Sequence, residues 1–186
     1  ELLESMPLLK RTFNVRDAGI TGATGPVKVL VNDCGEVTTT HAWLPPVIKG
    51  SSANVASHPC GVAGNIAMDN GSNMVAAAAG LPQLYSHDGC GSDGPAQTAW
   101  TWGLSQGIDL GNCSWWNGNK GSIVFLDRFF DHTIRNFNVM MFKSTGNQGN
   151  TGTPYNTSPG NGFNMTNSGA YNDGDNVDWS DDAMAS

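Results

Sequence analysis

Apolar and polar residues alternate in several short stretches of the chain, a pattern typical of half-buried β-strands. The clearest stretch is 27–32, where Val27, Val29 and Val31 share one face and Leu30 alone departs from the alternation. A polar turn follows it, and then the stretch 36–43, which contains three consecutive threonines. The two stretches together predict a β-hairpin.

Three later stretches also predict strands. Residues 98–104 place Trp100 and Trp102 on one face of a strand. Residues 122–127 form a short apolar run, and residues 133–142 alternate between two environments, so we expect these two stretches to pair with each other. The pattern as a whole predicts a mainly β fold, in which a loop-rich antiparallel β head carries a short N-terminal helix.

That helix is expected in the first ten residues. Leu2, Met6 and Leu9 follow helical spacing, and Pro7 should end or kink the helix. Two interpretations stay open: the end of a coiled coil that feeds a globular head, or a short helix packed on its own domain. Glycine then stands at every third position over residues 19–25, a spacing that collagen requires but that glycine-rich loops also show.

The composition changes after residue 143. Residues 144–186 consist mostly of Gly, Asn, Thr, Ser and Asp, with a few scattered aromatic residues. Such a long polar stretch is expected to be irregular or to pack on a neighbouring subunit. The predicted organisation is therefore a helix end and glycine-triplet neck over 1–26, a β-rich head over 27–143, and a polar segment over 144–186.

The charge of the chain excludes some partners. Only 13% of the 186 residues are charged, about half the usual share, and 24 residues are glycine. The net charge is −7 and no basic stripe is present, so a nucleic-acid partner is not expected. No apolar run approaches the roughly 18 to 20 residues that a membrane-spanning helix needs, so no membrane span is expected in this segment.

Four widely spaced cysteines bear on the compartment: Cys34, Cys60, Cys90 and Cys113. Their even number and the lack of a CxxC pair fit two disulfides better than a zinc site. Three pairings are possible, and the sequential one would close two loops of roughly 25 residues. Four reduced, buried thiols are the alternative. Disulfides would indicate an extracytoplasmic location, namely the cell surface, a secreted form or a virion surface.

Aromatic residues supply the candidate ligand-binding site. The set consists of residues that could stack on a sugar ring or anchor an interface, with one amide beside them: Tyr85, Trp100, Trp102, Trp115, Trp116 and Asn117. Trp115 and Trp116 lie in a turn-like context, which favours exposure over a strand interior. Packing in a core or between subunits remains the alternative for the whole set.

A weaker set of residues predicts hydrolase chemistry. Gly103–Gly107 matches the G-x-S-x-G pattern around Ser105, which in α/β-hydrolases holds a nucleophile between a strand and a helix. Asp127, Asp131 and His132 are the acidic and basic residues that would complete such a site, and the two aspartates could also serve a carbohydrate-active enzyme. A chance match is the alternative in a chain so rich in Gly and Ser.

Metal-binding candidates are weaker still. The four histidines, His41, His58, His87 and His132, show neither H-x-H nor H-x-x-x-H spacing, so we interpret them as separate surface or core residues. Asp173, Asp175 and Asp178 offer the oxygen ligands that calcium prefers, without EF-hand spacing. A solvated acidic tail is the alternative, so no cofactor is expected, with calcium as the one possibility.

A helix end that carries leucines, then glycine triplets, then a Gly-, Asn- and Trp-rich β head resembles the distal tip of a trimeric fibre. Phage tail-fibre tips and bacterial trimeric surface adhesins are similar in style, and residues 1–32 carry most of the likeness. The resemblance implies an intertwined homotrimer whose end loops bind a cell-surface glycan or protein receptor during host recognition.

The leading functional hypothesis is thus a binding module rather than an enzyme. A secreted hydrolase or carbohydrate-active enzyme is the first alternative, and a structural surface or capsid component is the second.

Overall fold

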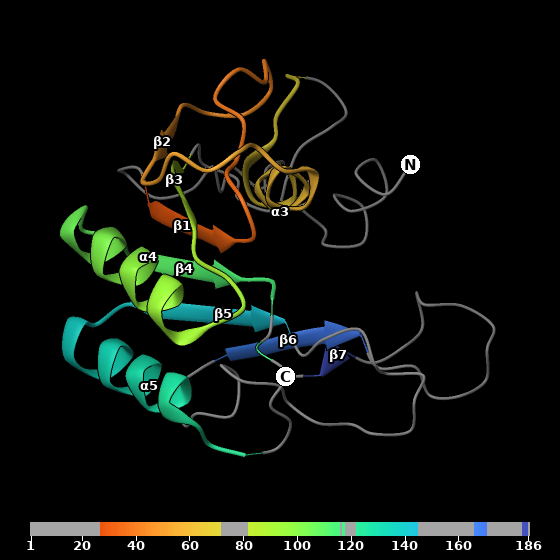
Figure 1. The fold of residues 1–186 in the computed structure, drawn as a ribbon. Helices are drawn as coiled ribbons and strands as arrows, with labels where there is room; N and C mark the ends of the chain where they lie inside the picture. The colour runs from red at the N-terminus through yellow and green to blue at the C-terminus, as the bar shows by residue number, and fades with distance from the viewer. Residues whose placement is uncertain are drawn as a thin grey trace.

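The structure is a computed structural model, and it describes residues 27–71, 82–115, 117, 122–144, 166–170 and 184–185. Over these residues the chain forms a twisted sheet with helices packed on it (Figure 1). The fold is α/β, so the prediction of a mainly β, antiparallel head is wrong.

The sheet consists of seven strands. In chain order they are β1 (Lys28–Asp33), β2 (Val47–Lys49), β3 (Gln83–Asp88), β4 (Leu110–Cys113), β5 (Met140–Ser144), β6 (Thr166–Ala170) and β7 (Met184–Ala185). Their order across the sheet is β2-β3-β1-β4-β5-β6-β7. Every pair from β2 to β6 is parallel, and only the short β7 pairs antiparallel.

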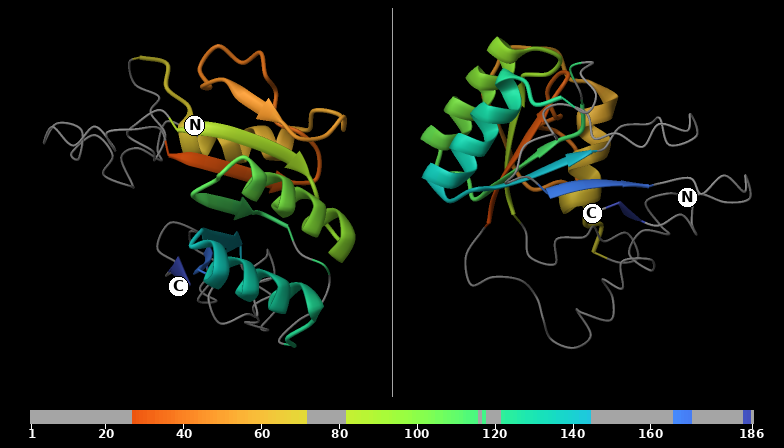
Figure 2. Two further views of the ribbon diagram at one scale, coloured as in Figure 1. Left: turned by 90° about the vertical axis from the view of Figure 1, so that its left-hand side faces the viewer. Right: turned by 90° about the horizontal axis from the view of Figure 1, so that it is seen from below.

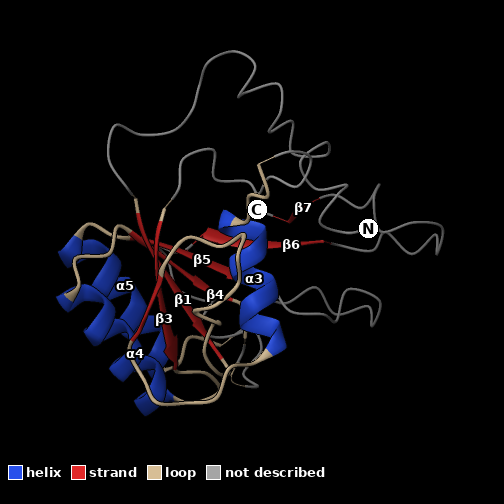
Figure 3. Cartoon of the chain, turned by 90° about the horizontal axis from the view of Figure 1, so that it is seen from above, coloured by secondary structure: helices blue, strands red, loops and turns tan. Residues whose placement is uncertain are grey.

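In the described part of the chain, three helices connect these strands and cover both faces of the sheet. They are α3 (Ser57–Ala67), α4 (Asp93–Ser105) and α5 (Phe125–Phe137). The views of Figure 2 and Figure 3 show α3 on one face, with α4 and α5 side by side on the other. The domain therefore has three layers, with a buried sheet between two layers of helix.

The central strand β1 shows why Leu30 breaks the alternation. Val29 and Val31 pack in the core beneath α3, whereas Leu30 packs in the core beneath α4 and α5. All three side chains are buried. The sequence of a strand that is covered on both faces is a continuous apolar run, because the side chains on each face pack against hydrophobic residues.

Buried residues in the helices recur every three to four positions, the spacing that places them on one helix face. In α5 the buried residues Leu126, Phe130 and Thr133 lie at positions i, i+4 and i+7. The helix begins where the Val124 amide donates to Asp127 Oδ2 at 2.9 Å, which satisfies one of the free amides of the first turn. Asn138 ends it in the left-handed conformation, which asparagine tolerates.

Three of the strands predicted from the sequence were wrong. Residues 98–104 belong to α4, 122–127 lead into α5, and 133–142 are the end of α5 followed by β5. In α4, the helical turn buries Trp100 fully and leaves Trp102 only partly buried, although both had been assigned to one strand face. Short apolar runs fit either period, and burial against the sheet decides between them.

The predicted hairpin is also wrong, although its first strand is confirmed as β1. Residues 36–43 form no second strand: Glu36 makes a single parallel bridge to Val55, and β1 instead pairs in parallel with β3 and β4. Parallel pairing needs a long crossover, which the chain supplies through β2 and α3.

The predicted N-terminal helix, the glycine triplets at 19–25 and most of the polar segment 144–186 lie outside the described residues. Within the described part of the chain, no helix is both long and apolar enough to cross a membrane.

Candidate active site

The carboxyl ends of the central strands form the edge of the sheet where a site is expected. After β1 the chain passes through β2 to α3 on one face, whereas after β4 it passes to α5 on the other face. Adjacent strands whose connections diverge in this way open a crevice at their carboxyl ends, and α/β proteins commonly bind ligands there. Asp33 is the last residue of β1, so its side chain lies at this point.

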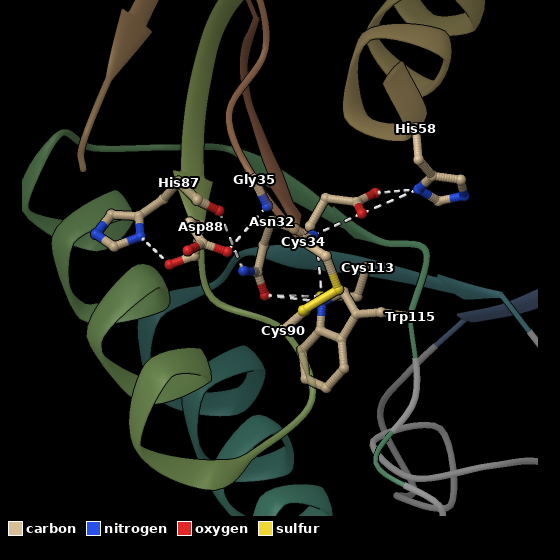
Figure 4. Close-up of a disulfide and its surroundings, with 10 residues drawn as sticks. Asn32, Cys34, Gly35, His58, His87, Asp88, Cys90, Cys113 and Trp115 are labelled. Carbon is tan, nitrogen blue, oxygen red and sulfur yellow. Dashed lines mark hydrogen bonds and ion pairs between the residues drawn. A yellow bond between two sulfur atoms is a disulfide. The ribbon is translucent and has the colours of Figure 1, made fainter. Parts of the chain in front are cut away.

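The side chains of Asp33 and His58 are in contact at this edge, at the distance of an ion pair. The Nδ1 atom of His58 lies 2.9 Å from Oδ1 and 3.0 Å from Oδ2 of Asp33. The Asp33 side chain is 1% exposed, whereas that of His58 is 61% exposed. Figure 4 shows His58 at the start of α3, with its second ring nitrogen directed away from the contact. The imidazole is thus anchored on one nitrogen and open on the other.

Backbone pairing after β1 brings the start of α3 to Asp33. The Glu36 amide donates to the Asn54 carbonyl at 2.9 Å, and the Ala56 amide donates to the Glu36 carbonyl at 3.0 Å. Ala56 is the residue before α3, so this pairing places the first turn of the helix beside the loop that follows Asp33. His58 is the second residue of that turn, which explains how residues 25 positions apart meet.

Gly35 makes this close approach possible. Its φ is +109°, a conformation that residues with a Cβ rarely adopt. A Cβ built on Gly35 would lie 2.8 Å from the Cβ of Ala56 and 3.1 Å from the Asn54 carbonyl oxygen. Glycine is therefore required here for both conformation and space.

A buried carboxylate ties the same loop to two further segments. Glu36 is fully buried, and its Oε1 accepts a hydrogen bond from the Ser51 amide at 2.9 Å and another from the Ser51 hydroxyl. Its Oε2 accepts from the Ser86 hydroxyl, which in turn accepts from the Val37 amide at 2.8 Å. Buried charge is tolerated when donors surround it, so Glu36 holds the loop in place.

The cysteine prediction is only partly right. Cys34 and Cys90 form a disulfide, which joins the loop after β1 to the loop after β3. Cys60 and Cys113 are free thiols, so the expectation of two disulfides is wrong, and the disulfide that forms is not one of the sequential pairs. The parallel register explains the pairing that forms, because Asp33 lies beside Asp88 and both chains leave the sheet at the same edge.

Cys113 and Lys143 lie beside each other at the ends of β4 and β5. Burial raises the pKa of the Cys113 thiol to about 12, although the neighbouring Trp100 side chain and the charge of Lys143 oppose the rise. Burial also lowers the pKa of Lys143 to about 8, against the opposing charges of Cys113 and Asp127. Desolvation thus favours the neutral form of both groups.

The predicted aromatic site is not a single exposed surface. Trp100 is fully buried against Phe130, and Tyr85 and Trp115 are about 5% exposed. Trp102 packs over Tyr85, with ring centroids 5.9 Å apart. Asn117 is partly buried, and Trp116 lies outside the described residues. Most of the described members of the set are core residues.

Trp115 nevertheless contributes to the candidate site. Its indole N–H donates to the Asn32 carbonyl at 3.0 Å, and Asn32 directly precedes Asp33 (Figure 4). The Asn32 side chain is buried and accepts from the Cys113 thiol at 3.4 Å. The end of β4 therefore supports the backbone of β1 from the face opposite α3.

The predicted hydrolase residues do not come together as a site. Ser105 ends α4, and its hydroxyl donates to the Trp102 carbonyl at 2.6 Å. This end of α4 lies at the amino ends of the strands, because Lys28 Nζ at the start of β1 donates to the Gln106 carbonyl at 2.8 Å. Ser105 is thus at the edge of the sheet opposite Asp33.

The remaining predicted residues lie on α5 or outside the described chain. Asp127 is buried and caps the helix, whereas Asp131 is partly buried and His132 is exposed. His132 contacts Asn136 one turn along the helix. Asp173, Asp175 and Asp178, the calcium candidates, lie outside the described residues. Within the described part, no group of three or more His, Cys, Asp or Glu side chains could hold a metal ion.

The pair Asp33–His58 was missed from the sequence. The sequence contains an acidic residue at the end of a buried strand and a histidine near the start of a helix. The spacing of the two residues along the chain does not indicate that their side chains are in contact. Asp33 was treated as part of a polar turn, and His58 was grouped with three unrelated histidines.

Comparisons with known proteins bear on the fold of the chain. No family model matches the chain, and no curated protein matches it. Among solved structures it is similar to the prenylagaramide maturation protease PagA, with a TM-score of 0.60 and 17% sequence identity. The match covers 88% of this chain and 67% of that chain. At this identity the likeness concerns the fold alone.

The fibre-tip interpretation is therefore wrong. The chain has an α/β fold similar to that of a protease, not an antiparallel β head, and nothing in the described residues supports an adhesin, a tail fibre, a homotrimer or a receptor partner. The hydrolase alternative agrees better with the fold than the binding module does, and the comparisons do not test the role of Ser105.

Proposed function

We propose that the chain is part of a peptide-bond hydrolase in which Asp33 and His58 are two members of a nucleophile–His–Asp triad. The observation that carries the proposal is the contact of His58 Nδ1 with the buried Asp33 carboxylate, with the rest of the ring exposed. Similarity of the fold to a maturation protease supports peptide-bond hydrolysis as the class of reaction.

The roles follow from the geometry. Asp33 accepts a hydrogen bond from the Nδ1–H group, which fixes the tautomer and leaves the lone pair on Nε2. Nε2 then takes the proton from a nucleophile that attacks the peptide carbonyl, and later returns it to the leaving amine. Asp33 stabilises the imidazolium ion that forms between the two steps.

The nucleophile is expected outside the described residues. Among the described residues, Asp33 is the hydrogen-bond partner of the His58 ring, and no hydrogen bond joins that ring to a Ser, Thr or Cys side chain. Aspartate before histidine is the chain order of triads in α/β proteases of the subtilisin type, where the serine follows the histidine. The proposal thus predicts a serine that follows His58 in the chain.

The test is covalent labelling of the full-length protein with a fluorophosphonate probe, which reacts with activated serines. Mass spectrometry identifies the labelled residue, and cleavage of a fluorescent casein substrate measures activity. We expect His58→Ala to abolish labelling and Asp33→Asn to lower kcat by roughly 10⁴-fold.

His132→Ala and Ser105→Ala are the matched controls, since these residues are exposed and lie away from the pair. Both should label and cleave like the parent protein. Labelling that survives His58→Ala, or that is lost with Ser105→Ala, would contradict the proposal.

The compartment forms a second part of the proposal. The Cys34–Cys90 disulfide supports an oxidising, extracytoplasmic location, since disulfides are rare in reducing compartments. Thiol alkylation of the protein isolated from its native source, followed by peptide mapping, tests this. Alkylated Cys34 and Cys90 in the native protein would contradict it.

A further inference from the structure

The backbone around Asp33 is held by two short segments, 33–35 after β1 and 88–90 after β3. The Cys34 amide donates to Asp33 Oδ1 at 2.7 Å, and the Gly89 amide donates to the Asp33 carbonyl at 3.0 Å. In the reverse direction, the Gly35 amide donates to Asp88 Oδ1 at 2.9 Å. The orientation of the carboxylate therefore depends on the two segments staying together.

The regular strand pairing does not extend to these segments. The last register pair of β1 and β3 is Asp33 with Asp88, and beyond it the ladder ends. Just beyond this pair the disulfide joins Cys34, the residue after Asp33, to Cys90, the second residue after Asp88 (Figure 4). The cross-link thus includes Cys34, whose backbone amide donates to Asp33, and directly follows Gly89, whose amide also donates to Asp33.

Few other contacts fix the carboxylate. Among the described residues, its hydrogen-bond partners are the Cys34 amide and His58 Nδ1. His58 cannot fix Asp33 by itself, because the imidazole side chain is largely exposed and is held by that same contact. The Cys34 amide is thus the backbone group that fixes the Asp33 carboxylate, and the disulfide holds the backbone of Cys34 in place.

The disulfide is also accessible. Cys34 is exposed and Cys90 is partly buried, so a thiolate from solvent can reach the bond at Cys34. Thiol–disulfide exchange with a small dithiol breaks the S–S bond through a mixed disulfide. The dithiol loses two electrons and two protons as it closes into its own disulfide, and Cys34 and Cys90 gain them as two thiols.

We propose that the Cys34–Cys90 disulfide positions the Asp33 carboxylate on His58, so that the pair forms correctly only in the oxidised protein. This inference rests on the proposed function for its catalytic consequence, but the geometry of the pair is measurable without catalysis. Cys34 and Cys90 act through Asp33, and they are positioning residues.

The first readout is the proton NMR signal of the His58 ring in the full-length protein. A proton on Nδ1 that is held by a carboxylate gives a far-downfield resonance, and Asp33→Asn identifies it by its loss. We expect this resonance in the oxidised protein and its loss or broadening after reduction with dithiothreitol. The Cys34→Ala/Cys90→Ala variant should behave like the reduced protein.

The second readout is the split between kcat and KM. A misplaced base slows the chemical step while substrate still binds, so reduction should lower kcat on the order of 10²-fold with little change in KM. Reoxidation should restore kcat in the parent protein and leave the double variant unchanged. Cys60→Ser is the matched control, because Cys60 is a free thiol on α3.

Loss of the cross-link also destabilises the chain, so both readouts are taken in a stabilising concentration of sulfate and on samples with the far-UV circular dichroism of the oxidised protein. A folded, reduced protein that keeps both the resonance and kcat would overturn the inference. If the resonance depends on the disulfide but no cleavage is seen in either state, the positioning role holds and the proposed function fails.

Discussion

At the scale of single residues, Lys143 and Cys113 show how burial sets charge. Both side chains are about 1% exposed or less, and they lie opposite each other at the ends of neighbouring parallel strands. Lys143 Nζ donates to the carbonyl of Ser144, which supplies one partner to a group that water does not reach. The folded structure therefore favours the neutral form of each side chain more than the unfolded chain does.

This arrangement predicts an unusual dependence of stability on alkaline pH. The folded pKa of Lys143, about 8, lies below its ordinary value of 10.5, so between these values the unfolded chain binds more protons. The free energy of unfolding therefore rises with pH across that window, by on the order of 3 kcal/mol in total. Below pH 8 the cost of burying the charged lysine is fully present.

Cys113 acts in the opposite direction at higher pH. Its folded pKa, about 12, lies above its ordinary value of 9.0, so between these values the folded chain binds more protons and stability falls. The two effects together predict a rise from pH 8 to 9, a flat region up to about pH 10.5, and a fall above it.

Urea unfolding at a series of pH values measures this profile. In Lys143→Met the rise between pH 8 and 9 should be absent, and in Cys113→Ala the fall above pH 10.5 should be weaker. A parent protein whose unfolding free energy changes with pH in the same way as that of Lys143→Met would contradict the assignment.

At the scale of elements, the important junction is between the loop after β1 and the start of α3. Gly35→Ala should lower the free energy of unfolding by about 2–4 kcal/mol, because alanine meets both a strained φ and the Ala56 side chain. The same change should weaken the Asp33–His58 contact, since it pushes α3 away from the loop.

Gly61→Ala is the matched control for this prediction. Gly61 lies inside α3, and an added Cβ there meets nothing within 4 Å. Alanine is the better helix former by about 1 kcal/mol, so this change should stabilise the protein. Thermal denaturation of the two variants checks both signs, and equal effects would show that the junction is not tightly packed.

The elements also show what the sequence could and could not predict. The strand at β1 was predictable, because a run of buried β-branched residues is specific to strands. The helices α4 and α5 were not, since residues 98–104 and 122–127 are too short to show a period of 3.6. Their helical character is decided by packing against a parallel sheet, which the sequence does not display.

The candidate site was less predictable than the fold. Asp33 and His58 lie on different elements, and what joins them is the backbone pairing of Glu36 with residues 54–56. That pairing needs no special residue except the glycine at position 35. A polar turn and an isolated histidine were thus reasonable interpretations of residues whose meeting is a property of the tertiary structure.

At the scale of the whole molecule, the disulfide encloses a large part of the described chain. The chain between Cys34 and Cys90 contains α3, which covers one face of the sheet, and the strands β2 and β3, which are two of its seven strands. The cross-link therefore restricts the unfolded chain over a long loop, and long loops lose the most entropy when they are closed.

Reduction of the disulfide should lower the free energy of unfolding by about 4 kcal/mol, because 56 residues separate the two cysteines. Urea unfolding of the oxidised and reduced protein measures the difference, and the reduced form should also show a larger m-value as its unfolded state expands. Cys60→Ser, which removes a free thiol, should leave the difference between the two redox states unchanged. A reduced protein as stable as the oxidised one would show that the hydrogen bonds between segments 33–35 and 88–90 hold them together without the cross-link, and the positioning role of the disulfide would then lose its physical basis.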